Sequence, residues 1–238
     1  LWDKNGEVYT DLYGGHAVIS VGHCHPHYVD MMTRQLGKLG FYSNSVVNPL
    51  QQQLAERLGK VCGYEDYQLF LVNSGAEANE CAIKVARLWG ATNKGEKYYN
   101  IITLKNSFHG RTVTTLAATG QDVFHTDFLP LTDGFVHTPA NDIAALEGVV
   151  KENKVAAIMI ECIQGEGGVL ALNEAFAKAA ADICAKEDIL LIVDEVQTGN
   201  GRTGALYGYM NFGITPDIVS TAKGLGGGLP IGATMFFE

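Results

Sequence analysis

The chain has 238 residues, of which 47% are apolar, and this content is ample for a buried globular core. Acidic residues outnumber basic ones by 26 to 17, for a formal net charge of −9, which argues against a nucleic-acid partner. The apolar runs are too short to span a bilayer, so no membrane partner is expected. The five cysteines are odd in number and scattered, which argues against a disulfide framework and favours a reducing cytoplasm.

The N-terminal segment, residues 1–50, is expected to contain a hairpin, one helix and the start of a second helix. An Asn-Gly pair at 5–6 lies between two short β-prone stretches, which is the strongest local signal for a type I′ turn. A helix is expected after Pro26, and the Asn-Pro pair at 48–49 is expected to open a second one. Residues 51–238 are then expected to form the main domain.

The main domain reads as an alternation of apolar strands and helices. Seven runs are expected as strands: residues 69–72, 101–104, 134–137, 155–160, 189–193, 218–219 and 231–237. Helical patterns separate several of them, with Asn141 and Asn173 as expected N-caps. This alternation predicts an α/β fold with a mostly parallel seven-stranded sheet flanked by helices.

The first candidate site residues follow the strand expected at 69–72. Ligands of open parallel sheets bind beyond the carboxyl ends of the strands. Ser74, Gly75 and Ala76 begin a helical run there, and small residues at a helix N-terminus expose backbone N–H groups that favour a phosphate. The plainer interpretation, in which these residues only cap the helix, stays open.

An aromatic residue and an arginine share the loop after the next strand. Phe108 can stack on a flat heteroaromatic ring, and Arg111 can grip a carboxylate with two parallel hydrogen bonds. The alternatives are Phe108 as a core residue, Arg111 in a surface ion pair and His109 as a histidine satisfied by the backbone. The clustering of these residue types favours a binding loop.

Carboxylates follow two of the most apolar runs. Glu161 and Glu166 come after residues 155–160, and Asp194 comes directly after residues 189–193. A carboxylate in such a place is costly to desolvate unless a positive group meets it. A protonated pyridine nitrogen would be a suitable partner for Asp194, and a simple helix N-cap is the alternative.

Lys223 lies just past the short strand expected at 218–219 and is followed by a glycine-rich stretch, residues 224–228. A partly desolvated lysine has a lowered pKa and can act as an amine nucleophile. The alternatives are an exposed lysine and a non-catalytic nucleotide-binding module built on the glycine stretch. The histidines and cysteine within residues 23–27 are expected to form a structured loop, and no metal is expected.

Several motifs occur together in the order typical of one family: residues 22–26, 73–80, 82–84, 86–87, 107–112, 163–169, 194–204 and 222–232. On these motifs the chain resembles the class III aminotransferases of fold type I, and among them the acetylornithine aminotransferases. The resemblance implies the large pyridoxal-phosphate-binding domain of that fold, without the family's C-terminal small domain. Cys162 stands where the family usually has proline, a departure at the turn that removes no catalytic group.

The resemblance also implies a role for each candidate residue. Lys223 would hold pyridoxal 5′-phosphate as a Schiff base and shuttle a proton, and Asp194 would keep the pyridine nitrogen protonated. The remaining roles would be phosphate binding by Ser74, Gly75 and Ala76, ring contacts by Phe108 and Gln197, and substrate binding by Arg111, Glu161 and Glu166.

The implied reaction is a ping-pong transfer of an amino group from N-acetylornithine to 2-oxoglutarate, a step of arginine biosynthesis, in a cytoplasmic homodimer. The alternatives are an ornithine, succinylornithine or 4-aminobutyrate aminotransferase, an aminomutase, or a chain that is catalytically incomplete without the small domain. The candidate site residues do not discriminate among these alternatives.

Overall fold

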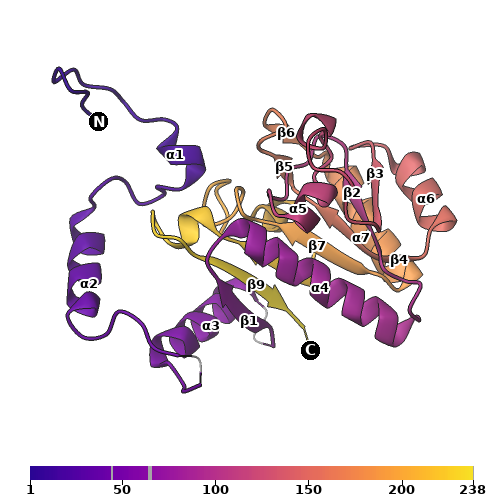
Figure 1. Cartoon of the computed structure of the whole chain (residues 1–238), viewed down its shortest axis with the longest axis horizontal. Helices are drawn as coiled ribbons and strands as arrows, with labels where there is room; N and C mark the ends of the chain where they lie inside the picture. Colours follow the sequence, from indigo (N-terminus) through magenta and orange to yellow (C-terminus); the bar gives the residue numbers. More distant parts are fainter. Residues whose placement is uncertain (44, 64–65, 238) are drawn as a thin grey trace.

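The computed structural model describes residues 1–43, 45–63 and 66–237. A seven-stranded sheet in the order β1-β9-β8-β7-β4-β2-β3 forms its centre (Figure 1). Its strands are β1 Gln68–Val72, β2 Asn100–Leu104, β3 Phe135–Thr138, β4 Val155–Ile160, β7 Leu190–Asp194, β8 Ile218–Thr221 and β9 Gly232–Phe236. Neighbouring strands from β8 to β3 are parallel, whereas β9 runs antiparallel to both β1 and β8. The predicted α/β fold with seven mostly parallel strands is confirmed.

Helices cover both faces of the sheet, which explains why its central strands are apolar on both sides. All six residues of β4 are buried. Ala157 and Met159 belong to the cluster that includes residues of α4 Gly75–Asn93, whereas Ile158 and Ile160 face the cluster that includes α7 Glu174–Glu187. The remaining body helices are α5 Val113–Ala118 and α6 Ile143–Glu152, with 3-10 turns at Asp122–Phe124, Gly208–Phe212 and Lys223–Leu225, and a small β5 Ile163–Gln164, β6 Leu170–Ala171 hairpin.

Of the two N-caps predicted in the main domain, the structure confirms one and contradicts the other. Asn173 accepts a hydrogen bond from the Phe176 amide and caps α7, as predicted. At α6 the N-cap is Asp142, whose carboxylate accepts from the Ala145 amide, so the prediction of Asn141 was wrong. Asn141 has φ +62°, in the left-handed region, whereas an N-cap residue needs an extended backbone.

The N-terminal turn is not type I′. A type I′ turn needs positive φ at both central residues, but of the Asn5-Gly6 pair only Gly6 has it, at +85°. The Asp3 carboxylate instead accepts from the amides of Asn5 and Glu7, and the Gly6 amide donates to the Asp3 carbonyl. The side chain of Asp3 therefore centres the turn one residue earlier, and the hairpin contains a single bridge outside the main sheet.

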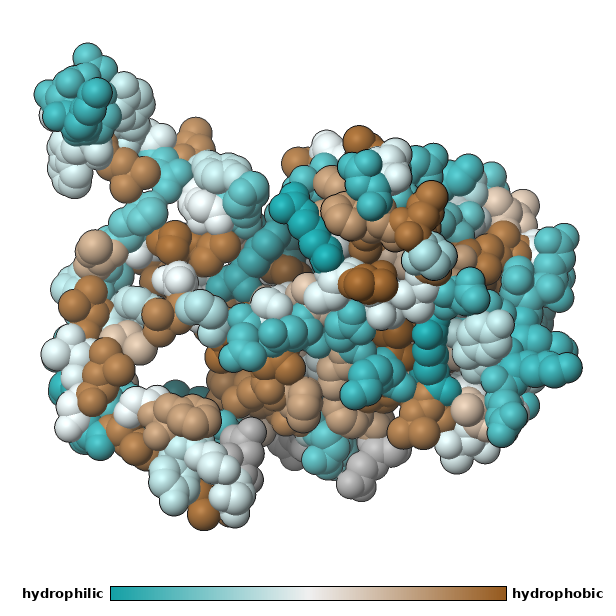
Figure 2. All heavy atoms as spheres, in the orientation of Figure 1, coloured by the Kyte–Doolittle hydropathy of each residue, from teal (hydrophilic) through white to brown (hydrophobic). Residues whose placement is uncertain are grey.

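The N-terminal segment contains α1 Gly14–Ala17, α2 Pro26–Leu36 and the start of α3 Pro49–Cys62, and it extends from the body at the left of Figure 1. Asn48 caps α3 as predicted, by accepting from the Leu50 amide. No residue of α2 is buried, and apolar side chains lie on the surface of this segment in Figure 2. Across the described part of the chain, none of the helices is long and apolar enough to cross a membrane.

Candidate functional site

One cavity of about 580 Å³ lies beyond the carboxyl ends of the parallel strands. Its lining contains all ten of the sequence-predicted site residues: Ser74, Gly75, Ala76, Phe108, Arg111, Glu161, Glu166, Asp194, Gln197 and Lys223. They lie at or just after the carboxyl ends of β1, β2, β4, β7 and β8, which the sheet brings to one edge. Gly15, His16 and Val18 of the N-terminal segment also line the cavity.

The first turn of α4 forms one wall. The Ser74 hydroxyl accepts from the Glu77 amide at 3.2 Å, so the capping interpretation is correct for this side chain. The amides of Gly75 and Ala76 belong to the first turn, where no carbonyl lies one turn earlier to accept from them. A Cβ at Gly75 would lie 2.7 Å from Cγ1 of Val196, so only glycine fits there. Two backbone donors and the helix dipole therefore meet at the cavity.

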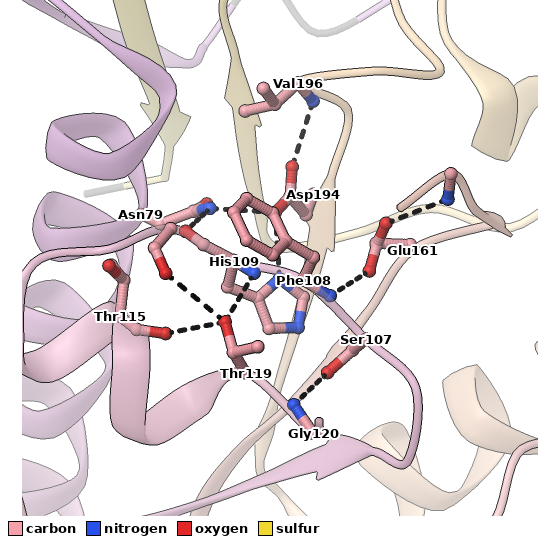
Figure 3. A network of polar contacts seen from close by, with 12 residues as sticks. Asn79, Ser107, Phe108, His109, Thr115, Thr119, Gly120, Glu161, Asp194 and Val196 are labelled. Carbon is pink, nitrogen blue, oxygen red and sulfur yellow. Dashed lines mark hydrogen bonds and ion pairs between the residues drawn. The ribbon is translucent and has the colours of Figure 1, made fainter. Parts of the chain in front are cut away.

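Asp194 is 4% exposed and accepts three hydrogen bonds (Figure 3). Its Oδ1 accepts from the Val196 amide at 3.0 Å. Its Oδ2 lies 2.8 Å from both Asn79 Nδ2 and His109 Nδ1. Turns, not a helix, follow β7, so the interpretation of Asp194 as a helix N-cap was wrong. These donors fix a buried carboxylate in one orientation at the cavity wall.

Asn79 and His109 were not predicted as site residues. The alternative in which the backbone satisfies His109 was wrong, because the ring bonds the Asp194 carboxylate. Burial lowers the pKa of His109, but the hydrogen bond to Asp194 and the negative charges of Asp194 and Glu161 together raise it above its ordinary value. The available signal for Asn79 was a polar residue on a helix face of small and apolar residues such as Ala82 and Ile83.

Lys223 follows β8 and reaches the same cavity. Burial lowers the pKa of its amine, against the opposing effect of the negative charges of Asp194, Glu161 and Glu166. A lower pKa increases the share of neutral, nucleophilic amine at a given pH. Its φ of +45° is unusual for a residue other than glycine.

Glu161 ties two loops together from a position that is 5% exposed. Its carboxylate accepts from the Phe108 amide at 2.8 Å and from the Gly165 amide at 3.4 Å. Burial raises the pKa of this carboxyl to about 7, with the charge of nearby Asp194 adding to the effect and His109 opposing it. The placement of Glu161 thus differs from that of an exposed substrate contact.

Aromatic rings hold Arg111 in place. Its guanidinium lies 5.8 Å from the ring centroids of both Phe108 and Phe124, which contact each other edge to face at 5.6 Å. No ion pair involves Arg111 within the described residues, so the surface-ion-pair alternative was wrong. The cation remains available to a carboxylate that enters the cavity.

Gln197 and Glu166 also line the cavity, and the Gln197 side chain lies against Gly165. A Cβ at Gly165 would lie 1.3 Å from Oε1 of Gln197, so a larger residue there would displace the Gln197 side chain. Outside this site, the Asp11 carboxylate lies 2.7 Å from His23 in the exposed 23–27 region. In the described ranges of the chain, no group of three His, Cys, Asp or Glu residues could hold a metal ion.

We expect Glu161→Gln to flatten the pH dependence of stability. The folded pKa of about 7 exceeds the ordinary value of 4.5, so the folded protein keeps a proton that the unfolded chain has lost between these values. The stability contributed by this proton is fully present below about pH 4.5 and is lost as the pH rises towards 7. Urea unfolding at several pH values measures the slope. An unchanged slope in Glu161→Gln, matching that of exposed Glu152→Gln, would contradict this assignment.

The fold and cavity define a class of α/β domain in which an amine, a buried carboxylate and a helix N-terminus converge at the carboxyl edge of a parallel sheet. A sequence profile of the class III aminotransferases matches residues 1–237, and the chain belongs to this family. The resemblance noted from the motifs is confirmed.

Individual relatives agree with the family. The acetylornithine aminotransferase of Haemophilus ducreyi is 48% identical over 238 residues, 100% of this chain and 60% of that protein. The N-acetylornithine aminotransferase of Stenotrophomonas maltophilia K279a superposes with a TM-score of 0.85 at 39% identity, over 100% of this chain and 59% of that one. An ornithine aminotransferase of Toxoplasma gondii, with partial occupancy of pyridoxal phosphate at its active site, superposes with a TM-score of 0.94 at 35% identity. This superposition covers 100% of this chain and 56% of that one. The chain thus spans about 60% of the length of the curated relative.

Proposed function

We propose that the protein transfers an amino group from N-acetylornithine to 2-oxoglutarate with pyridoxal 5′-phosphate as its cofactor. One observation carries the proposal: the Lys223 amine and the buried Asp194 carboxylate line the same cavity as the free amides at the start of α4. This set matches an aldehyde, a pyridine nitrogen and a phosphate, which are the three recognition elements of the cofactor.

The residues present fit this cofactor. The cavity volume of about 580 Å³ is within the range of small-molecule sites. Asp194 is anchored by Asn79 and His109 on one oxygen, so its charge is fixed where a protonated ring nitrogen can meet it. Phe108 and Val196 line the cavity as apolar surfaces for a flat ring.

When bound, pyridoxal phosphate supplies an electron sink for the charge that develops as a substrate C–H proton is removed. Lys223 would bind the aldehyde carbon and then move the proton through its Nζ atom. Asp194 would stabilise the positive ring nitrogen, and Gln197 would donate to the ring oxygen. The α4 amides with Ser74 would hold the phosphate.

The substrate side of the site would be formed by Arg111, Glu166 and Glu161. Arg111 is held by two rings without an ion pair in the described structure, so its planar guanidinium can donate two parallel hydrogen bonds to a substrate carboxylate. Glu166 also lines the cavity and would face the substrate amine. Glu161 would act through the two loops that its carboxylate joins.

We further propose a homodimer that acts in the cytoplasm, within arginine biosynthesis. The N-terminal segment supports a homodimer, because it lines the cavity with His16 yet leaves most side chains of α2 exposed. Five free cysteines, of which three are buried, fit a reducing compartment. The division into residues 1–50 and 51–238 stays a prediction.

A coupled assay of glutamate formation from 2-oxoglutarate tests the substrates. N-acetylornithine is expected to give the largest kcat/KM among N-acetylornithine, N-succinylornithine, ornithine and 4-aminobutyrate. A preference for ornithine would replace the proposed donor and keep the chemistry. Omission of pyridoxal phosphate from protein stripped of cofactor is expected to abolish glutamate formation, and undiminished turnover would contradict the proposal.

A further inference from the structure

The backbone around Lys223 adopts a conformation that its own residue types do not favour. Lys223 has φ +45°, in the left-handed region. A lysine in the left-handed region carries a conformational cost and persists only where the surroundings impose it. The groups that impose this conformation therefore determine where the Lys223 amine points.

Asn200 contacts the backbone directly before Lys223. Its Nδ2 donates to the Ala222 carbonyl and to the Thr221 hydroxyl, each at 3.1 Å. The two acceptors are consecutive residues at the end of β8, so one amide group holds both the strand end and the peptide that enters Lys223. Asn200 itself has φ +58°, a conformation that asparagine tolerates better than most residues.

We propose that Asn200 is a positioning residue, which holds the peptide before Lys223 so that the lysine side chain is directed into the cavity. The inference rests on the proposed function, in which Lys223 is the reacting amine. Asn200 is absent from the cavity lining, so it acts on the reaction through Lys223 and not by touching a substrate.

The loop that carries Asn200 is anchored in the core. Buried Glu195 accepts from the Thr198 hydroxyl at 2.6 Å and from the amides of Gly208 and Tyr209, each at 2.8 Å. The Gly199 amide also donates to the Glu195 carbonyl. These bonds to Glu195 hold the loop on both sides of Asn200, so the Asn200 side chain is fixed beside the peptide that precedes Lys223.

The backbone after Lys223 is held from the opposite side. Ser20 Oγ donates to the Gly224 carbonyl at 3.2 Å, and Tyr28 donates to the Gly226 carbonyl at 2.8 Å. A Cβ at Gly224 would lie 3.0 Å from both the Asn200 Cβ and the Ser20 hydroxyl. The loop therefore fits between Asn200 and the N-terminal segment, and Asn200 is the contact on the strand side.

The position of the amine sets its charge environment. The carboxylates that face it are Glu161 after β4, Glu166 in the following loop and Asp194 at the end of β7, while burial opposes its protonation. A Lys223 side chain released from this position would be more hydrated. Its pKa would then rise towards that of an ordinary lysine, and it would meet the reacting carbon less often.

The test compares Asn200→Gly and Asn200→Asp with the parent. Glycine keeps the left-handed backbone and removes both hydrogen bonds, and aspartate keeps the shape and replaces the donor by an acceptor. Asn141→Gly is the matched control, because Asn141 also has positive φ and two side-chain hydrogen bonds but lies outside the cavity lining. Thermal unfolding followed by circular dichroism shows that each variant is folded.

Two readouts are measured: the steady-state kcat and KM, and the pH dependence of Lys223 modification by trinitrobenzenesulfonate, mapped on peptides. Both Asn200 variants are expected to lower kcat by about tenfold with KM changed much less. The pH midpoint of Lys223 modification is expected to move upward, and Asn141→Gly should match the parent in both. The modification of Lys223 needs no cofactor, so its pH midpoint tests Asn200 even if the parent protein transfers no amino group. That absence of transfer would contradict the proposed function and not the role of Asn200. A folded Asn200→Gly with unchanged kcat and midpoint would overturn the inference.

Discussion

Lys223→Ala is expected to lower kcat for amino-group transfer on the order of 10⁴-fold or more. The lysine supplies both the amine that would bind the cofactor and the group that would move the substrate proton, so one substitution removes two functions. In the described structure no other lysine lines the cavity, and none can replace it. The loss should be present at every substrate concentration, because it concerns chemistry and not binding.

Lys105→Ala provides the control, since Lys105 is exposed, follows β2 and lies outside the cavity lining. Its kcat is expected to equal that of the parent within about twofold, as for a surface substitution away from the site. Activity in Lys223→Ala within about tenfold of the parent would show that another group carries the proton transfer.

Asp194→Asn is expected to lower kcat by about 10²–10³-fold, comparable with the loss of one preorganised electrostatic contact in other active sites. The carboxylate accepts from Asn79 and His109 on one oxygen and from the Val196 amide on the other. An asparagine side chain lacks the negative charge that would stabilise a protonated ring nitrogen. It also replaces one acceptor by a donor that must face one of these three donors.

Asp182→Asn is a suitable control, because Asp182 is exposed on α7 and lies outside the cavity lining. Binding of pyridoxal phosphate, measured by fluorescence quenching, separates cofactor loss from slower chemistry in Asp194→Asn. We expect a reduced kcat in Asp194→Asn even at saturating cofactor. A kcat equal to that of the parent in Asp194→Asn at saturating cofactor would contradict the proposed pairing of Asp194 with the ring nitrogen.

The fold was accessible from sequence because hydrophobic burial produces local patterns. The fully buried β4 appears as an uninterrupted apolar run, and Ser74 and Asn173 cap helices where the periodicity begins. Strand direction was less accessible: nothing in residues 232–236 indicates that β9 runs antiparallel to β8. The turn at residues 5–6 failed because the Asp3 side chain, not the Asn-Gly pair, supplies the hydrogen bonds.

The candidate site was accessible because parallel strands end at one edge, so residues after separate strands share a cavity. The contacts that support the site residues could not be predicted from the sequence. Asn79 lies 115 residues from Asp194 in sequence, and His109 lies 85 residues from it. Asn200 meets the Ala222 carbonyl, an acceptor that every residue type offers. Side chains that act through another residue leave no motif of their own, and only the folded backbone identifies their partners.

The most direct test of the central claim is to incubate the protein with pyridoxal phosphate, reduce with borohydride and locate the bound cofactor by peptide mass spectrometry, alongside Lys223→Ala. We expect one stoichiometric modification on the peptide that contains Lys223, with a visible absorption band before reduction and neither signal in the variant. Modification spread over exposed lysines, equal in the parent and in Lys223→Ala, would contradict the assignment of Lys223 as the cofactor-binding residue.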